Sequence, residues 1–293
     1  MIYFDNSATT AIDPAVLKTY TDVATKIMGN PSSLHNLGTV AGRMLEASRK
    51  QIADLLGKAT SEIYFTSGGT EGDNWILKGV AFEKRVYGNH IIVSSVEHPA
   101  VKASAEWLAT QGFEVDFAPV DHNGFVKLDA LAALIKKETI LVSVMAVNNE
   151  IGTIEPIRQI GELLADKPTI SFHVDAVQAV GKLDIREFLP ERVDFATFSA
   201  HKFHGPRGVG FVYIKKGKKL QPLLTGGGQE TNQRSTTENV AGIAATAKAL
   251  RMVLSDSEAK LVKLAAMKEV LLTALADYSD VVVFSQRDDF VPN

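Results

Sequence analysis

The stretch TILVSVMAV, residues 139–147, decides the fold class, because almost every residue in it is apolar. A strand with one face in water alternates apolar and polar residues, whereas a parallel strand covered on both faces is a continuous apolar run. We therefore expect residues 139–147 to form a central strand of a mainly parallel sheet, with helices on both of its faces.

Similar runs lie on either side of this stretch, with helix-like segments between them. The predicted strands cover 62–67, 90–95, 113–120, 169–175, 194–200 and 209–214, and the predicted helices cover 68–84, 100–112 and about 156–165. This alternation predicts an α/β fold with a mainly parallel seven-stranded sheet wrapped by helices. A helix over 256–278 and a strand over 280–285 suggest the start of a further α/β unit.

Composition narrows the class of protein. The 293 residues are 45% hydrophobic and 22% charged, with a formal net charge of −3 and no cysteine. This charge predicts neither nucleic acid nor a membrane surface as a partner, and no apolar run is long enough to span a bilayer. The first residues, MIYFDNSATT, do not resemble a secretory signal, so we expect a cytoplasmic protein. Without cysteine, this chain has no disulfide, thiolate metal site or cysteine nucleophile.

Polar or glycine-rich groups follow five of the predicted strands. They are residues 67–70, 97–98, 148–149, Asp175 and residues 199–202. In sheets of this kind, ligands bind beyond the carboxyl ends of the strands. The five groups are therefore expected to share one pocket.

The segment SAHKFHGPRGVG, residues 199–210, contains the most reactive candidate side chain, Lys202. Lys202 lies between two histidines, and a partly buried lysine near other cations has a lowered pKa, so its amine can condense with an aldehyde. Ser199 and His201 on the same turn are candidates to hold a phosphate. The alternative is a zinc site formed by His201, His204 and His173, although no H-E-x-x-H pattern accompanies them.

Two further segments are typical of a phosphate site and of a ring-stacking site. TSGGTE places Gly69 and Thr70 at a strand-to-helix turn, where free amide groups and the helix dipole suit a phosphate. Gly-Gly-Thr also occurs in ordinary turns. His98 follows a strand and precedes a proline-started helix, so it can stack on a planar ligand, move protons, or simply cap the helix.

Asp175, Gln178 and Asn149 complete the set. Asp175 ends an apolar strand, where its carboxylate either pairs with a cationic ring nitrogen or caps the next helix. Gln178 can donate to a phenolic oxygen on that ring, and Asn149 to a ring oxygen or a substrate carboxylate, unless Asn149 serves only a turn. With the phosphate and lysine candidates, these are the groups that pyridoxal 5′-phosphate (PLP) requires.

Eight ordered motifs carry a family resemblance. They are YFDNSATT, GNPSSLHNLG, FTSGGTEGDN, VEHPAV, VNNEIGTIEPI, HVDAVQAVGK, SAHKFHGPRGVG and GGGQE…RSTTENVAG, from residue 2 to about 245. This series resembles the NifS/IscS-like cysteine desulfurases, class V aminotransferases of PLP fold type I. The resemblance implies a PLP-binding large domain over 15–250, an N-terminal arm over 1–14, and the start of a small domain over 251–293.

The resemblance also implies roles for single residues. Lys202 matches the cofactor lysine, Asp175 the partner of the ring nitrogen, Gln178 the donor to the ring hydroxyl, and His98 the stacking, proton-moving histidine. Thr70, Ser199 and His201 match phosphate ligands, and Asn149 matches the residue that contacts substrate and ring. Thr237 resembles the threonine that reaches the phosphate across a homodimer interface, although Thr236 replaces the usual glycine before it.

The implied reaction converts L-cysteine, or a related amino acid, to alanine and passes sulfur to an acceptor protein for iron–sulfur clusters or tRNA thiolation. In the family, a catalytic cysteine and a carboxylate-binding arginine lie in a C-terminal region that this chain is expected to lack. Formation of an enzyme persulfide by this chain is therefore not expected. The alternatives are another class V activity (selenocysteine lyase, transaminase or β-lyase) and a non-catalytic, PLP-binding dimer.

Overall fold

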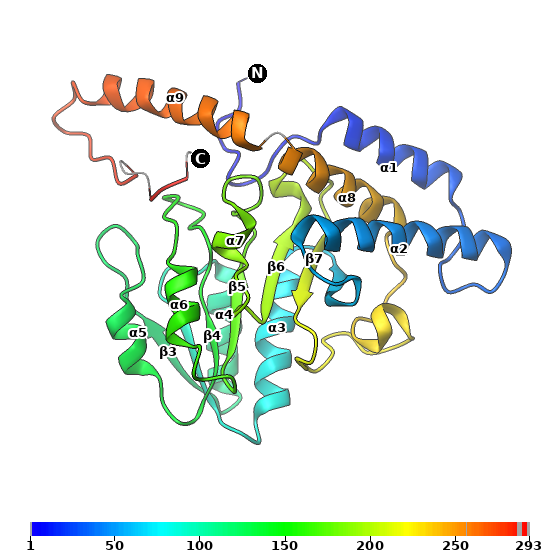
Figure 1. Ribbon diagram of the computed structural model, residues 1–293, viewed down its shortest axis with the longest axis horizontal. Coiled ribbons are helices and arrows are strands. Elements are labelled where there is room, and N and C mark those ends of the chain that lie inside the picture. Colours follow the sequence, from blue (N-terminus) through cyan, green and yellow to red (C-terminus); the bar gives the residue numbers. More distant parts are fainter. Residues whose placement is uncertain (1, 256, 286–288, 292–293) are drawn as a thin grey trace.

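One sheet forms the centre of the molecule. The computed structural model describes residues 2–255, 257–285 and 289–291. Within them, seven strands pair in the order β1-β7-β6-β5-β4-β2-β3 (Figure 1). The strands are β1 (Ile63–Thr66), β2 (His90–Ser94), β3 (Glu114–Ala118), β4 (Thr139–Ser143), β5 (Ser171–Asp175), β6 (Phe195–Ser199) and β7 (Gly210–Ile214). The predicted mainly parallel, seven-stranded sheet is therefore confirmed.

Helices cover both faces of this sheet. The α-helices are α1 (Pro14–Lys26), α2 (Asn36–Leu56), α3 (Gly69–Lys84), α4 (Pro99–Thr110), α5 (Leu128–Leu134), α6 (Ile157–Leu163), α7 (Ile185–Phe188), α8 (Val240–Ser255) and α9 (Ser257–Leu275). Side chains of α3 and α4 form one core with Leu141, and those of α2, α6, α7 and α8 form another with Val142. Leu141 and Val142 of β4 thus enter opposite cores, which explains why the middle of this strand is a continuous apolar run.

The strand directions bring the predicted polar groups to one edge. Only β7 is antiparallel to its neighbours, β1 and β6, while the other pairs are parallel. The carboxyl ends of six strands and the start of β7 therefore lie at the same edge. Gly68 has φ 155° and ψ −174°, a conformation that favours glycine, where β1 turns into α3. A Cβ at Gly210 would lie 2.8 Å from the Cα of Gly68, so the two loops approach closely.

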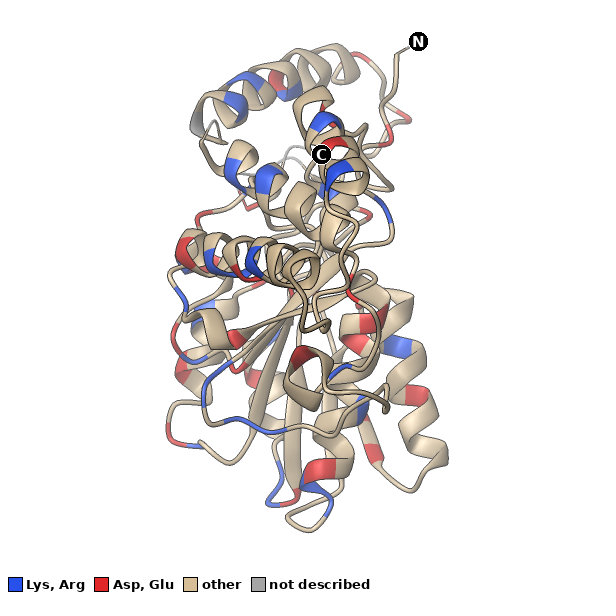
Figure 2. Ribbon diagram, turned by 90° about the vertical axis from the view of Figure 1, so that its right-hand side faces the viewer, with Lys and Arg blue, Asp and Glu red and all other residues tan. Residues whose placement is uncertain are grey.

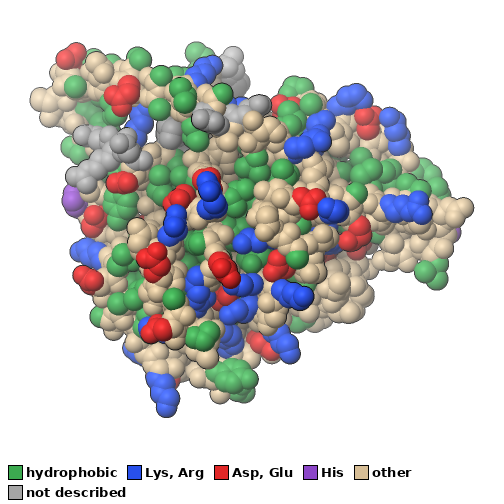
Figure 3. All heavy atoms as spheres, in the orientation of Figure 1, with side chains coloured by type: hydrophobic (Ala, Val, Ile, Leu, Met, Phe, Trp, Pro, Cys, Tyr) green, Lys and Arg blue, Asp and Glu red, His purple; other side chains and the backbone are tan. Residues whose placement is uncertain are grey.

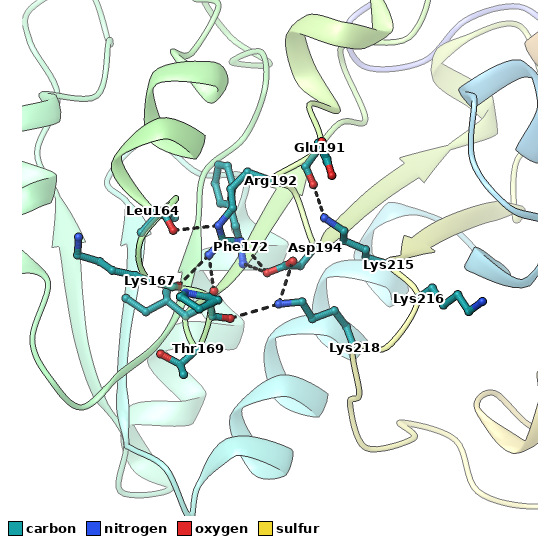
Figure 4. A network of polar contacts seen from close by, with 12 residues as sticks. Leu164, Lys167, Thr169, Phe172, Glu191, Arg192, Asp194, Lys215, Lys216 and Lys218 are labelled. Carbon is teal, nitrogen blue, oxygen red and sulfur yellow. Dashed lines mark hydrogen bonds and ion pairs between the residues drawn. The ribbon is translucent and has the colours of Figure 1, made fainter.

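A polar network closes the opposite edge of the sheet (Figure 4). Asp194, which is 2% exposed, accepts a hydrogen bond from Phe172 N and pairs with Arg192 and Lys218 at 2.9 and 3.0 Å. Arg192 also donates to the backbone carbonyls of Leu164, Lys167 and Ile170. Two cations and a backbone amide thereby offset the cost of burying one carboxylate, which indicates a structural role for this edge.

Charged residues lie mainly on the outside of the molecule. Figure 2 shows Lys, Arg, Asp and Glu on the outer helices and loops, with few on the strands. Figure 3 shows basic and acidic side chains interspersed on the face drawn there. None of the helices in the described part of the chain combines the length and apolar character needed to cross a membrane.

The last predicted strand is wrong. Among the residues that the structure describes, 280–285 pair with no strand, and Val281, Val282 and Phe284 are 43%, 74% and 56% exposed. The chain instead meets the rest of the molecule at Phe290, which bridges to Thr153 and packs edge-on against Phe125. In the described part of the chain no strand pairs with the apolar run at 281–283, and its β-propensity alone does not produce a strand. The predicted helix over 256–278 is confirmed as α9 over 257–275, and residue 256 lies outside the described residues.

Candidate functional site

A cavity of about 230 Å³ lies at the carboxyl edge of the sheet. Nine of the ten predicted site residues line it: Gly69, Thr70, His98, Asn149, Asp175, Gln178, Ser199, His201 and Lys202. They come from the ends of strands and from the segments that directly follow them, spread over more than a hundred residues of the chain. The prediction that these polar groups share one pocket agrees with the structure. Thr237 is the exception and lines a neighbouring cavity with Ser67, Gly208 and Arg234.

Lys202 ends a short 3-10 helix, Ala200–Lys202, directly after β6. Its amine donates hydrogen bonds to the backbone carbonyl of Ser7 and, at 2.9 Å, to that of Ala8. Burial lowers the pKa of Lys202, opposed by the charge of Asp175. The amine therefore gives up its proton more readily than an exposed lysine, which favours attack on an aldehyde.

The N-terminal arm fixes the turn that carries Lys202. Thr10 donates from its backbone N and from Oγ1 to the carbonyl of His201, at 2.9 and 2.8 Å. The same Oγ1 accepts a hydrogen bond from His204 N at 2.8 Å. His204 has a φ of 63°, a left-handed conformation that is uncommon outside glycine, so the arm holds a strained turn in place.

Three buried carboxyl groups lie beside or beneath the cavity. Asp175 is 5% exposed and accepts from Val177 N at 2.9 Å, while Asp73 and Glu97 each have one oxygen without a hydrogen-bond partner. Burial raises the pKa of all three, and the charge of Asp175 adds to the rise for Asp73 and Glu97. A cationic group in the cavity would relieve this cost at Asp175.

His98 and Asn149 each make a local contact as well as lining the cavity. His98 Nδ1 accepts from Ala100 N at 3.1 Å, so His98 caps α4. Asn149 donates from its amide to Glu150 at 2.7 Å. The structure therefore confirms that His98 caps the helix. In this capping position the imidazole ring still lines the cavity.

A second cavity of about 340 Å³ adjoins the first and shares Gly69, Thr70, Ser199 and His201 with it. The amino end of α3 and Arg207 also line it, and both favour an anion. Burial, with the charges of Lys202 and Arg207, lowers the pKa of His201 to about 4. His201 is then neutral near pH 7, and its Nδ1 lies 3.0 Å from Thr9 Oγ1. This side of the site suits a phosphate group.

Two ion pairs fix the loop that carries Thr237. Arg234 pairs with Glu71 of α3 at 2.6 and 2.8 Å. Farther back in the loop, Glu230 forms a two-pronged pair with Arg49 of α2, both bonds at 2.7 Å, and accepts from Phe65 N. Glu230 has a left-handed φ of 48°, so a buried charge pair holds an unfavourable backbone conformation.

The zinc alternative does not fit the structure. His173 is fully buried in β5, with Nδ1 2.8 Å from Ser143 Oγ and Nε2 3.1 Å from Thr197 Oγ1. Burial lowers its pKa to about 3, so it remains neutral in this network. Across the residues that the structure describes, no group of three His, Cys, Asp or Glu side chains is arranged to hold a metal ion.

Several lining residues were not predicted. They are Ala8, Asp73, Met145, Val147 and Val177 in the first cavity, with Thr9, Glu71 and Arg207 in the second. Asp73 carries the clearest signal in the sequence, since it is an acid close to the apolar run Trp75–Leu77. The arm residues carry no local signal, because their contacts are with residues nearly two hundred positions later.

Comparison with known proteins identifies the family. Residues 2–289 match the family described as aminotransferase class-V. The chain is 55% identical over 294 aligned positions to a protein named NifS/IcsS protein homolog from Lactobacillus delbrueckii subsp. bulgaricus, and it spans 76% of that protein's length. The chain belongs to the class V aminotransferases, in the cysteine desulfurase family. The predicted family resemblance is therefore confirmed, and the family is PLP-dependent.

Other similar proteins and solved structures support the same family assignment. A cysteine desulfurase IscS from Methanosarcina thermophila is 47% identical over 259 residues, which are 88% of this chain and 63% of that protein. A solved structure titled NIFS-LIKE PROTEIN superposes with a TM-score of 0.95 at 40% identity, covering all of this chain and 80% of the other. A structure titled SspA in complex with cysteine superposes with a TM-score of 0.80 at 33% identity, covering 86% and 72%. These structures confirm the predicted PLP fold type I.

Proposed function

We propose that this chain binds PLP in the 230 Å³ cavity and acts on L-cysteine as a desulfurase. The observation that carries the proposal is the placement of Lys202 and Asp175 in one cavity, beside a second cavity suited to phosphate. PLP needs an amine for its aldehyde, an acid for its ring nitrogen and donors for its phosphate. The residues present supply all three.

The buried carboxylate of Asp175 gives the strongest evidence that the cavity suits PLP. Its pKa is raised because burial disfavours the charged form. A protonated ring nitrogen is a cation, so pairing with it offsets this cost. Gln178 is 4% exposed and carries a donor for the ring oxygen, and Ser199 is similarly buried. Polar side chains buried around one cavity indicate a polar ligand.

When bound, PLP supplies an electron sink that stabilises negative charge on the substrate next to its carboxylate. Lys202 would hold the aldehyde carbon covalently and, once displaced by substrate, exchange a proton at the substrate Cα. His98 would lie against the ring and move a second proton. Gly69, Thr70, Ser199 and His201 would orient the phosphate, and Asn149 would face the substrate carboxylate. The cavity lining and the family membership support these roles.

We further propose that Thr237 acts on a second copy of the chain. Thr237 does not line either part of the candidate site in its own chain. The ion pairs of Arg234 and Glu230 hold its loop firmly at the surface beside that site. A homodimer in which each copy offers Thr237 to its partner's phosphate agrees with both features.

The sulfur must pass to a thiol outside these residues, because the 293 residues contain no cysteine. In a balanced reaction, L-cysteine and an external thiol give alanine and a persulfide of that thiol. The bond between the substrate Cβ and Sγ breaks as Sγ bonds to the thiol sulfur, and Cβ gains a proton in place of the one that the thiol loses. A protein thiol or a small thiol can serve as the acceptor.

The test is to add L-cysteine and dithiothreitol to the PLP-loaded chain and to measure alanine and sulfide. We expect both products in equal amounts, and neither from the Lys202→Ala variant. Pyruvate without alanine would instead indicate a β-lyase, and selenide from selenocysteine alone a selenocysteine lyase. Bound PLP with no product from any of these amino acids would identify a non-catalytic binder and contradict the proposed activity.

A further inference from the structure

Lys182 is connected to the candidate cofactor lysine through a short series of hydrogen bonds. Lys182 Nζ donates to Gln178 Oε1 at 2.9 Å. Gln178 Nε2 donates to the carbonyl of Ser7 at 2.8 Å, and the same carbonyl accepts from Lys202. The side-chain amide of Gln178 therefore lies between a lysine and a backbone carbonyl.

The chemistry of these two partners fixes the orientation of the amide. A lysine ammonium group only donates hydrogen bonds, and a backbone carbonyl only accepts them. If the amide were reversed, its NH₂ group would face the ammonium and its oxygen would face the carbonyl. Both hydrogen bonds would be lost in a side chain that is 4% exposed, where unsatisfied polar groups are costly.

This orientation decides what Gln178 offers to a ligand. An amide NH₂ group has two hydrogens, and the carbonyl of Ser7 takes one of them. The second remains for an acceptor in the cavity that Gln178 lines. A reversed amide would present an oxygen instead, which repels a phenolic oxygen on a bound ring.

We propose that Lys182 is a positioning residue that fixes the Gln178 amide, so that its nitrogen faces the phenolic oxygen of the cofactor ring. This inference rests on the proposed function, because it takes PLP as the ligand. Lys182 itself does not line the cavity. The hydrogen bond to Gln178 is the contact through which we expect Lys182 to act on the ring oxygen.

The experiment compares PLP with 3-deoxypyridoxal 5′-phosphate, which lacks the phenolic oxygen but keeps the aldehyde and phosphate. Burial and the charge of Lys202 lower the pKa of Lys182 to about 8, so binding is measured at pH 7, where the amine is mainly protonated. The variants are Lys182→Met, which cannot donate, and Lys182→Arg, which can only donate. Lys182→Gln is a second loss variant, because its amide can donate or accept and so does not fix Gln178.

We expect Lys182→Met to weaken PLP binding about tenfold, the equivalent of one hydrogen bond of roughly 1.4 kcal/mol, and to leave binding of the deoxy analogue unchanged. Lys182→Gln should show a smaller loss of the same kind, and Lys182→Arg should restore most of the affinity for PLP. Gln178→Leu should remove the preference for PLP over the analogue entirely.

Equal losses for both compounds in Lys182→Met would overturn the inference, because they would show a general effect on the fold or on charge. No loss for either compound would also overturn it. If the unaltered chain binds neither compound, the proposed function is wrong and this inference falls with it. If the unaltered chain binds both PLP and the deoxy analogue, a failure in the variants counts against the role of Lys182 and not against the proposed function.

Discussion

Lys202 donates a hydrogen bond to the backbone carbonyl of Ser7, 195 residues earlier in the chain. The N-terminal arm is thus part of the candidate site and not only a covering segment. The contact also explains how a lysine on a tight turn is kept pointing toward the cavity, since Ala8 supplies a second carbonyl to the same amine. Substitutions in the N-terminal arm should therefore alter the position of the Lys202 amine.

Thr10→Val tests how firmly the arm holds the Lys202 turn. The hydroxyl of Thr10 donates to His201 O and accepts from His204 N, and valine has the same shape without these bonds. We expect a loss of about 1–3 kcal/mol in the free energy of unfolding, measured by urea denaturation. Thr21→Val, which removes one exposed hydroxyl contact on α1, is the matched control and should cost far less. Equal effects would show that the arm contributes no more than a surface helix.

Arg49→Met tests the buried ion pair behind the Thr237 loop. The substitution leaves the carboxylate of Glu230, whose side chain is 1% exposed, without its cation. We expect a loss of about 3–5 kcal/mol of stability, because an unpaired buried charge is very unfavourable. Lys50→Met on the same helix breaks an exposed pair with Asp54 and should change stability by less than about 1 kcal/mol. A small effect of Arg49→Met would mean that the loop does not depend on this pair.

Glu155 should make stability depend on pH. Glu155 is 4% exposed, and burial raises the pKa of its carboxyl group from 4.5 to about 8. The folded state therefore keeps a proton that the unfolded state has lost, so the unfolded state binds fewer protons and stability falls as pH rises. The contribution is complete below about pH 4.5 and is lost as the pH passes through about 8.

Glu155→Gln removes this titration. We expect its unfolding free energy to decline less between pH 5 and 8 than that of the unaltered chain, by on the order of 2 kcal/mol. Some decline should remain, because burial also raises the pKa of Asp73, Glu97 and Asp175. Glu162→Gln, on the exposed side of α6, is the control and should keep the original slope. Identical slopes for Glu155→Gln and the unaltered chain would contradict the assignment.

The sequence predicts the sheet well because its strands are short, apolar and regularly separated. All seven lie within the predicted ranges, and β4 occupies the first five residues of the predicted 139–147. The helices α1, α2, α5, α7 and α8 were not predicted. The segment 280–285 was predicted wrongly because a strand needs a partner, and β-branched residues alone do not supply one.

Nine predicted site residues meet in one cavity because polar groups at the carboxyl ends of parallel strands share an edge. What the sequence does not predict are the contacts between distant segments. The arm carbonyls on Lys202, the Glu71–Arg234 pair and the Lys182–Gln178 bond involve residues that look ordinary where they stand. Their roles depend on how the chain folds back on itself, which local patterns do not specify.

The most direct test of the central claim is to identify the residue that bonds the cofactor. The chain is loaded with PLP and reduced with borohydride, which makes the link between lysine and cofactor permanent, and its peptides are then analysed by mass spectrometry. We expect the pyridoxyl group on Lys202, which lines the cavity with Asp175. A pyridoxyl group on Lys182 or another lysine, or none on the chain at all, would contradict the account.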